Sequence, residues 1–323
     1  MKRVRKAVLP VAGLGTRNLP AAKTTPKNLL NVFDRPLVAH VVAEARAAGI
    51  EHFVFIVGRG QSAIEDYFDH AFELELQLEA KGRTALLADL RADLPRPGEM
   101  SFVRQMAPLG LGHAVWCARD IVGDEPFAVM LPDMLMAAEP PALAQVIDAY
   151  EAVGGNIVAV EPAPPGEAHK YGIVALGAAE PGFEGRLNVM TSMVEKPAPG
   201  TEPSDLFISG RYILQPEIFS LLGAHETGAG GEIQLTDAML RLLRVQSFHA
   251  LRYDGVTHDC GDSLGLLKAN VAVALADPRL GAAARAAIEQ LLGATGPSVR
   301  SASPSGAPGP LAVKGGGRHR ERG

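Results

Sequence analysis

Short apolar runs alternate with longer amphipathic segments through the first half of this 323-residue chain. This alternation predicts βαβ units, in which buried strands are connected by helices that flank a mixed, mainly parallel sheet. The expected fold class is therefore α/β. The predicted strands are Ala7–Val11, His52–Val57, Ser101–Arg104 and Phe127–Leu131, and the predicted helices are Leu37–Ala48, Ser62–Glu79, Gly112–Ile121 and Ala142–Ala152.

The pattern changes after residue 155, where apolar runs follow one another with little helix between them. These runs predict a small additional, partly antiparallel sheet with strands at Asn156–Glu161, Gly172–Leu176, Leu187–Val194 and Phe207–Leu214. Helical patterns return afterwards, and one more strand is expected within Val245–Tyr253. The later predicted helices are Pro216–Leu222, Ile233–Arg244, Ser263–Leu275 and Ala282–Leu292.

The end of the chain differs from the rest in composition and charge. Residues 294–323 are rich in Gly, Pro and Ser and cannot bury enough apolar surface to order themselves. We therefore predict one folded domain over residues 1–293 and a disordered basic tail over residues 294–323. The formal net charge is −5, and the segment Thr295–Gly323 contributes +4, which leaves −9 on the body. An acidic body is unlike a nucleic-acid binder, which needs a broad basic face.

The cysteine content and the hydropathy of the chain limit the cellular compartments and the partners that we expect. The two cysteines, Cys117 and Cys260, are far apart, which makes a disulfide scaffold or a zinc site a poor interpretation and favours a reducing cytoplasm. No apolar run is long enough to span a bilayer, so no membrane partner is expected. The basic start of the chain is interpreted as the lead-in to a buried first strand.

The most informative local signal follows the first predicted strand. The segment Leu9–Arg17 reads LPVAGLGTR, and a Pro-Lys pair follows at Pro26–Lys27. Glycines at such a turn let the backbone approach a bound anion, and successive N–H groups can point at it. Arg17 and Lys27 would add positive charge where charge develops in phosphoryl transfer. A Rossmann fingerprint would need a third glycine where Asn18 stands, and no P-loop sequence is present.

This signature resembles that of the sugar-nucleotide pyrophosphorylases, in most detail that of the bacterial UTP–glucose-1-phosphate uridylyltransferases, from about Lys6 to about Leu280. The resemblance implies a Rossmann-like nucleotide-diphospho-sugar transferase fold and a catalytic domain over residues 1–293. The implied reaction joins UTP to α-D-glucose 1-phosphate and gives UDP-glucose and pyrophosphate. A homodimer or homotetramer is implied as well.

The resemblance also assigns a nucleotide site. Gln105 and Gly110, in a loop between a predicted strand and helix, match residues that hold uracil, and a side-chain amide can donate and accept at once. The backbone at Ala12, Gly13 and Gly15 is expected to contribute. Asn28 stands where the family has a Glu thought to contact the ribose.

Metal and sugar residues complete the expected site. Asp133 follows an apolar strand at the carboxyl end of the sheet, where open α/β sheets bind ligands, and Mg²⁺ prefers carboxylate and phosphate oxygens. The resemblance implies that Asp133 and Asp259 hold Mg²⁺. It further implies that Glu195 and Gly172 contact the sugar and that Lys196 reaches the phosphates.

Several positions depart from the family pattern, namely Asn28, Asn31, Ala39, His40 and Ser263. They leave room for a non-catalytic regulatory paralogue. A transferase for another sugar 1-phosphate or for dTTP is a second alternative. The missing third glycine argues against a third alternative, a Rossmann-type dehydrogenase. Retention of the charged residues Arg17, Lys27, Asp133, Glu195, Lys196 and Asp259 favours an active enzyme.

Overall fold

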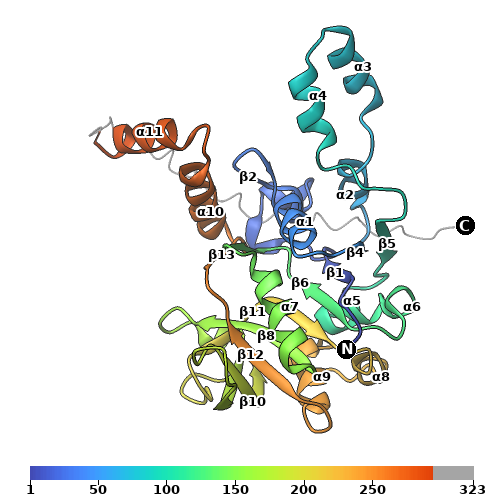
Figure 1. The fold of residues 1–323 in the computed structure, drawn as a ribbon, viewed down its shortest axis with the longest axis vertical. Coiled ribbons are helices and arrows are strands. Elements are labelled where there is room, and N and C mark those ends of the chain that lie inside the picture. The colour runs from blue at the N-terminus through green and yellow to red at the C-terminus, as the bar shows by residue number, and fades with distance from the viewer. Residues whose placement is uncertain (294–323) are drawn as a thin grey trace, which may run out of the picture. The chain divides into compact units, whose positions relative to one another are not determined.

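The computed structural model describes residues 1–293 (Figure 1). The chain divides into two compact units, Met1–Val273 and the part from Ala274 onward. Within the described residues, the second unit holds the end of α10 (Ser263–Ala276) and α11 (Gly281–Gly293). The predicted tail lies outside the described residues, and the domain boundary at residue 293 stays a prediction.

A nine-stranded mixed sheet forms the centre of the first unit. In spatial order the strands are β5 (Met100–Arg104), β4 (His52–Val57), β1 (Lys6–Pro10), β6 (Phe127–Met130), β11 (Leu206–Leu214), β8 (Asn156–Pro162), β12 (Phe248–Arg252), β10 (Leu187–Glu195) and β9 (Gly172–Ala179). Each neighbouring pair from β5 to β6 is parallel, and β8 and β12 are parallel to each other. The pairings of β11 with β6 and β8, and of β10 with β12 and β9, are antiparallel.

The strands expected to form a separate sheet after residue 155 extend the main sheet instead. The reason is β11, whose nine residues are all buried and which pairs with β6 on one side and β8 on the other. Two small additional sheets do form elsewhere in the described residues. They are the pairs β2 (Asn31–Val32) with β3 (Arg35–Pro36), and β7 (Met134–Ala137) with β13 (Val256–Asp259).

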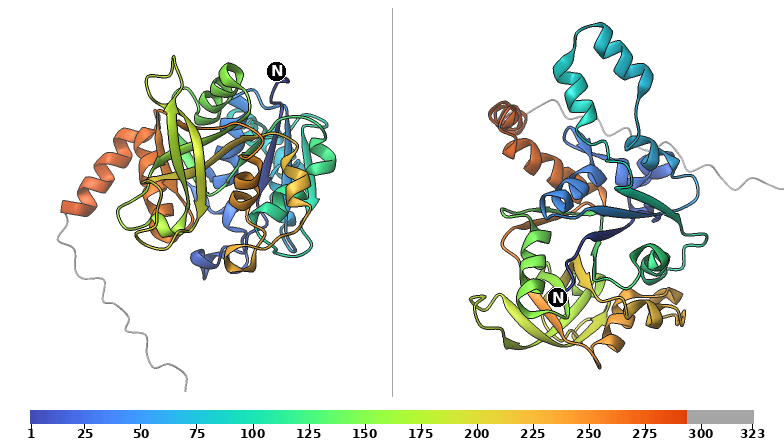
Figure 2. Two further views of the ribbon diagram at one scale, coloured as in Figure 1. Left: turned by 90° about the horizontal axis from the view of Figure 1, so that it is seen from below. Right: turned by 45° about the vertical axis from the view of Figure 1, so that its right-hand side comes forward.

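Helices cover both faces of the sheet, as Figure 2 shows. Alternation along β1 divides the core: Ala7 and Leu9 belong to the cluster on one face, and Val8 belongs to the other. The first face is covered by α1 (Leu37–Ala47), α2 (Ser62–Tyr67) and α7 (Ala142–Val153); the second by α5 (Leu111–Trp116), α6 (Arg119–Val122), α8 (Ile218–Leu222) and α9 (Leu235–Leu242).

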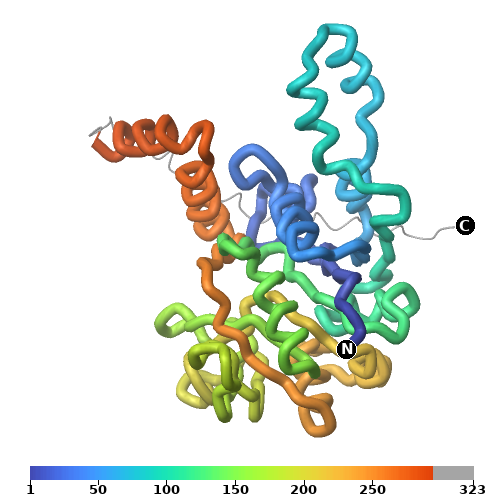
Figure 3. The backbone as a smooth tube through the Cα atoms, in the orientation of Figure 1, coloured from blue at the N-terminus to red at the C-terminus, as the bar shows by residue number. Residues whose placement is uncertain are grey.

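The helix expected over Ser62–Glu79 is interrupted. The α2 helix ends at Tyr67, and the chain then forms a helical hairpin of α3 (Phe72–Ala80) and α4 (Thr84–Arg91), whose path is clear in Figure 3. Glu75 ties the hairpin together, because its carboxylate accepts hydrogen bonds from His70 at 2.9 Å and from Arg91 at 2.7 Å. These two partners lie five and sixteen residues from Glu75, outside the spacing that a helical periodicity detects.

The parallel strands bring their carboxyl ends to one edge of the sheet. The glycine loop follows β1, Gln105 follows β5, and Asp133 follows β6. This is the edge where open α/β sheets bind ligands. No helix within residues 1–293 combines the length and the apolar character that crossing a membrane requires.

Candidate active site

The glycine loop has a backbone that requires glycine at one position. Gly15 has φ of 64°, in the left-handed region. A Cβ atom there would lie 2.9 Å from Cβ of Lys27 and 3.1 Å from Cβ of Ala22. Lys27 therefore packs directly on the loop, and the absence of a side chain at Gly15 lets it do so.

Five of the six residues predicted to bind the nucleotide line one cavity of about 360 Å³. The walls come from the loop after β1 on one side and from the β5–α5 segment on the other. Glu232 and Leu14 also line it. The predicted residues in this wall are Ala12, Gly13, Gly15, Gln105 and Gly110.

Asn28, the sixth, lies elsewhere. Its side chain is fully buried and donates a hydrogen bond to the Val11 carbonyl at 3.1 Å. Asn28 therefore anchors the backbone at Val11, where the glycine loop begins, and is not part of the cavity wall. Its Oδ1 atom has no protein partner among the described residues.

Lys27 and Asp133 form an ion pair, with 2.6 Å between Nζ and Oδ2. Burial alone would raise the pKa of Asp133, but the ammonium of Lys27 and its hydrogen bond outweigh burial and hold that pKa below its usual value. A depressed carboxyl pKa stabilises the folded state above the unfolded pKa, and this contribution is lost as the pH falls through the folded pKa. Asp133 is thus ionised at neutral pH.

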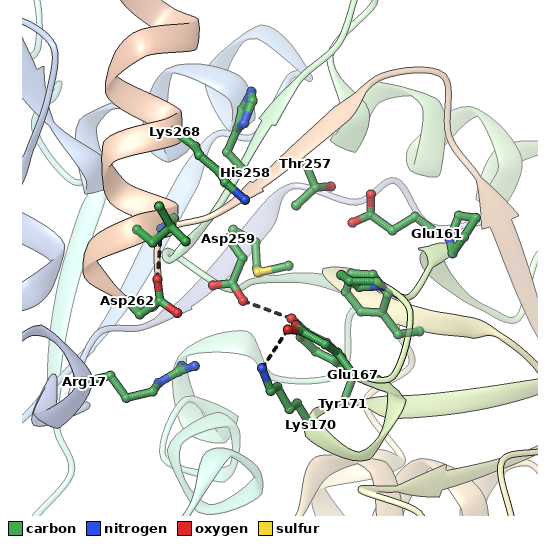
Figure 4. A pocket seen from close by; sticks show the side chains of 16 residues that line it. Arg17, Glu161, Glu167, Lys170, Tyr171, Thr257, His258, Asp259, Asp262 and Lys268 are labelled. Atoms are coloured by element: carbon green, nitrogen blue, oxygen red, sulfur yellow. Dashed lines mark hydrogen bonds and ion pairs between the residues drawn. The ribbon is translucent and has the colours of Figure 1, made fainter. Parts of the chain in front are cut away.

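Arg17 and Asp259 line a second cavity of about 290 Å³, shown in Figure 4. Asp259 accepts hydrogen bonds from the Gly261 N–H at 2.7 Å and from the Tyr171 hydroxyl at 3.3 Å. Burial, and next the charge of Asp259, raise the pKa of Tyr171, so its hydroxyl stays a donor. Four charged residues of this wall were not expected from the sequence, namely Glu161, Glu167, Lys170 and Lys268.

Asp133 and Asp259 lie on neighbouring chain segments. The Cys260 N–H donates to the Asp133 carbonyl at 2.8 Å, next to the pairing of Asp259 with Met134. Burial, and then the charges of Asp259 and Asp133, raise the pKa of the Cys260 thiol to about 12.

Within residues 1–293, no cluster of three or more His, Cys, Asp or Glu side chains could hold a metal ion unaided. Two carboxylates completed by substrate phosphate oxygens fit the usual Mg²⁺ environment.

The residues predicted for the sugar form a third group. Gly172 pairs with Glu195 across β9 and β10, and a Cβ atom at Gly172 would lie 3.1 Å from Oε2 of Glu195. Thr236 donates to that same oxygen at 2.7 Å and so orients the carboxylate. The Lys196 ammonium lies 3.6 Å from Glu195, and its backbone has φ of 46°.

A buried ion pair, which no local sequence pattern predicts, supports the turn that carries Asp133. Arg211 is fully buried and pairs with Glu44 at 2.6 Å. Its guanidinium also donates to the carbonyls of Leu131 at 3.1 Å and Met134 at 2.8 Å, on either side of Asp133. A register shift in β11 between Ile208 and Tyr212 marks the irregular backbone from which Arg211 projects. Arg211 therefore holds the turn in place.

Comparison with known proteins connects this geometry to a family. Residues 6–274 match the family model described as nucleotidyl transferase. The chain is 45% identical to the UTP–glucose-1-phosphate uridylyltransferase of Bacillus subtilis, over 87% of this chain and 94% of that protein. The chain belongs to the nucleotidyl transferase family.

Solved structures agree with this membership. A UDP-glucose pyrophosphorylase from Acinetobacter baumannii has a TM-score of 0.81 at 42% identity, with 89% of this chain and 99% of that chain covered. A UDP-glucose pyrophosphorylase complexed with UDP-glucose has a TM-score of 0.73 at 35% identity, with 84% and 98% covered. The expected nucleotide-sugar transferase fold is confirmed. Nucleotidyl transferases of this kind generally use a divalent metal.

Four of the residues that depart from the family pattern lie outside the two cavities. His40 donates from Nε2 to the Val32 carbonyl at 2.9 Å, and Ala39 is buried in α1. The Asn31 carbonyl accepts from Asn270 at 3.2 Å, and Ser263 begins α10. None of these four residues lines either cavity.

Proposed function

We propose that this chain transfers the uridylyl group of UTP to α-D-glucose 1-phosphate and releases UDP-glucose and pyrophosphate. The observation that carries the proposal is the cavity that Ala12, Gly13, Gly15, Gln105 and Gly110 form beside the Lys27–Asp133 pair. The named activity of relatives that cover about nine-tenths of the chain supports the same reaction.

The reaction is an in-line displacement. A phosphate oxygen of glucose 1-phosphate forms a bond to the α-phosphorus of UTP, and the bond from that phosphorus to the β-bridging oxygen breaks. The electron pair leaves with pyrophosphate, so no covalent enzyme intermediate is required. Positioning and charge neutralisation then provide the rate acceleration.

Three cations and three carboxylates take roles in this scheme. Lys27 exchanges its contact with Asp133 for a phosphate oxygen, while Arg17 and Lys196 neutralise the remaining phosphoryl charge. Asp133 and Asp259 would hold Mg²⁺, which supplies charge neutralisation at the phosphates when bound. Glu195, oriented by Thr236, accepts hydrogen bonds from sugar hydroxyls beside the bare backbone of Gly172.

The test is pyrophosphate release from UTP, glucose 1-phosphate and Mg²⁺, against dTTP and other sugar 1-phosphates. We expect kcat/KM for UTP with glucose 1-phosphate to exceed that of each other pair by at least about tenfold. Preference for dTTP or another sugar would establish that alternative instead. Retained UDP-glucose binding without turnover would establish a non-catalytic paralogue.

Compartment and assembly are also part of the proposal. Both cysteines are free thiols, which supports a reducing, cytoplasmic location. The family resemblance supports a homodimer or a homotetramer.

A further inference from the structure

The side-chain amide of Gln105 is held in one orientation. Its Nε2 atom donates to the Gly110 carbonyl at 3.2 Å and to Nδ1 of His113 at 3.0 Å. A carbonyl oxygen only accepts, so the nitrogen end of the amide must face Gly110. Oε1 is then the amide atom that has no protein partner within residues 1–293, and Gln105 lines the nucleotide cavity.

His113 fits the role of acceptor. Because Nδ1 receives the Gln105 amide, the imidazole carries its proton on Nε2 and is neutral. Burial, and next the nearby His225, lower the pKa of His113, which keeps Nδ1 unprotonated near neutral pH. His225 and Trp116 pack against the ring, at centroid distances of 5.6 and 5.8 Å, and the Cys117 sulfur lies 3.9 Å from Nδ1.

We propose that His113 is a positioning residue that sets base selectivity by fixing the orientation of the Gln105 amide. The inference rests on the proposed function and extends it. With Oε1 facing the cavity, Gln105 accepts a hydrogen bond from the N3–H of uracil or thymine. Cytosine has an unprotonated N3 atom, so two acceptors would face each other.

The structure also makes the opposite amide orientation costly. Rotating the amide to offer Nε2 to cytosine would turn Oε1 toward the Gly110 carbonyl, which only accepts, and toward Nδ1 of His113, which would have to take up the ring proton from Nε2. The rotation would therefore break both of the present hydrogen bonds of the amide, and breaking either one is unfavourable because it leaves a buried polar group unpaired. His113 supplies one of these two barriers, and it is the one that a side-chain substitution can remove.

The experiment compares UTP and CTP with the wild type, His113→Leu and His113→Asn. His113→Leu removes the acceptor and is expected to lower the UTP:CTP ratio of kcat/KM by about tenfold, the equivalent of one lost hydrogen bond. His113→Asn can offer Oδ1 in place of Nδ1 and should keep the ratio within about threefold of the wild type. A purely structural defect would lower both nucleotides equally.

His225→Asn is the matched control, because it alters the ring packing around His113 and no hydrogen bond to Gln105. The same ratio is measured as Kd for UTP and CTP by calorimetry. A wild type that binds UTP without turnover would contradict the proposed function, and the Kd ratios would still test His113. An unchanged ratio in His113→Leu, or equal ratios in the Leu and Asn variants, would overturn the inference.

Discussion

Asp133→Asn is expected to lower kcat/KM for UDP-glucose formation by about a hundredfold to a thousandfold, the scale of removing one preorganised charge from a transition-state site. Asn keeps the size of the side chain, but it loses the charge that pairs with Lys27 at 2.6 Å and that would ligate Mg²⁺. The Mg²⁺ concentration for half-maximal rate should rise as well. Steady-state pyrophosphate release over a Mg²⁺ titration measures both effects.

Asp124→Asn is the control for that variant. Asp124 precedes β6, whereas Asp133 follows it, and its side chain is 91% exposed. This substitution removes a carboxylate from the opposite end of the same strand and should leave activity unchanged. Asp133→Asn with wild-type turnover and an unchanged Mg²⁺ requirement would refute the assignment of Asp133 as a metal ligand.

Arg211→Met is expected to destabilise the fold by about 3–5 kcal/mol, as removal of one partner from a buried ion pair does. The substitution leaves the buried Glu44 carboxylate without its cation and removes the guanidinium donors to the Leu131 and Met134 carbonyls. Because these carbonyls flank Asp133, turnover of the folded fraction should fall too. Urea denaturation measures the loss of stability.

A double variant, Glu44→Leu with Arg211→Met, distinguishes the cost of an unpaired buried charge from the cost of altered packing. Since no charge is then stranded, it should recover part of the stability lost by the single variant. Arg5→Met provides a comparison, because Arg5 pairs with Glu51 at 2.7 Å on the surface and its loss should have a far smaller effect. A wild-type urea midpoint for Arg211→Met would contradict the supporting role of Arg211.

The parts of the fold that the sequence predicts are those encoded locally. Apolar runs locate the parallel strands within a residue or two, and the strand β4 is predicted at its observed bounds. The glycines after β1 mark the loop that lines the first cavity, because their spacing reflects a backbone requirement at Gly15. Residues such as Gln105 and Gly110 also follow from a short segment that resembles the family.

The parts that escape prediction depend on contacts between distant positions. Arg211 and Glu44 are 167 residues apart, and nothing near either residue reveals the partner. The small β7–β13 sheet likewise joins segments more than 100 residues apart. Asn28 matches a ligand position by alignment of residues, but its partner in the structure is the Val11 carbonyl beneath the loop.

The decisive measurement is a crystal structure of this chain soaked with UTP and Mg²⁺. We expect uracil against Gln105 and Gly110, the triphosphate along the loop at Gly13 and Gly15, and a cation on Asp133. A nucleotide bound elsewhere, or a loop cavity that stays empty at saturating UTP, would contradict it.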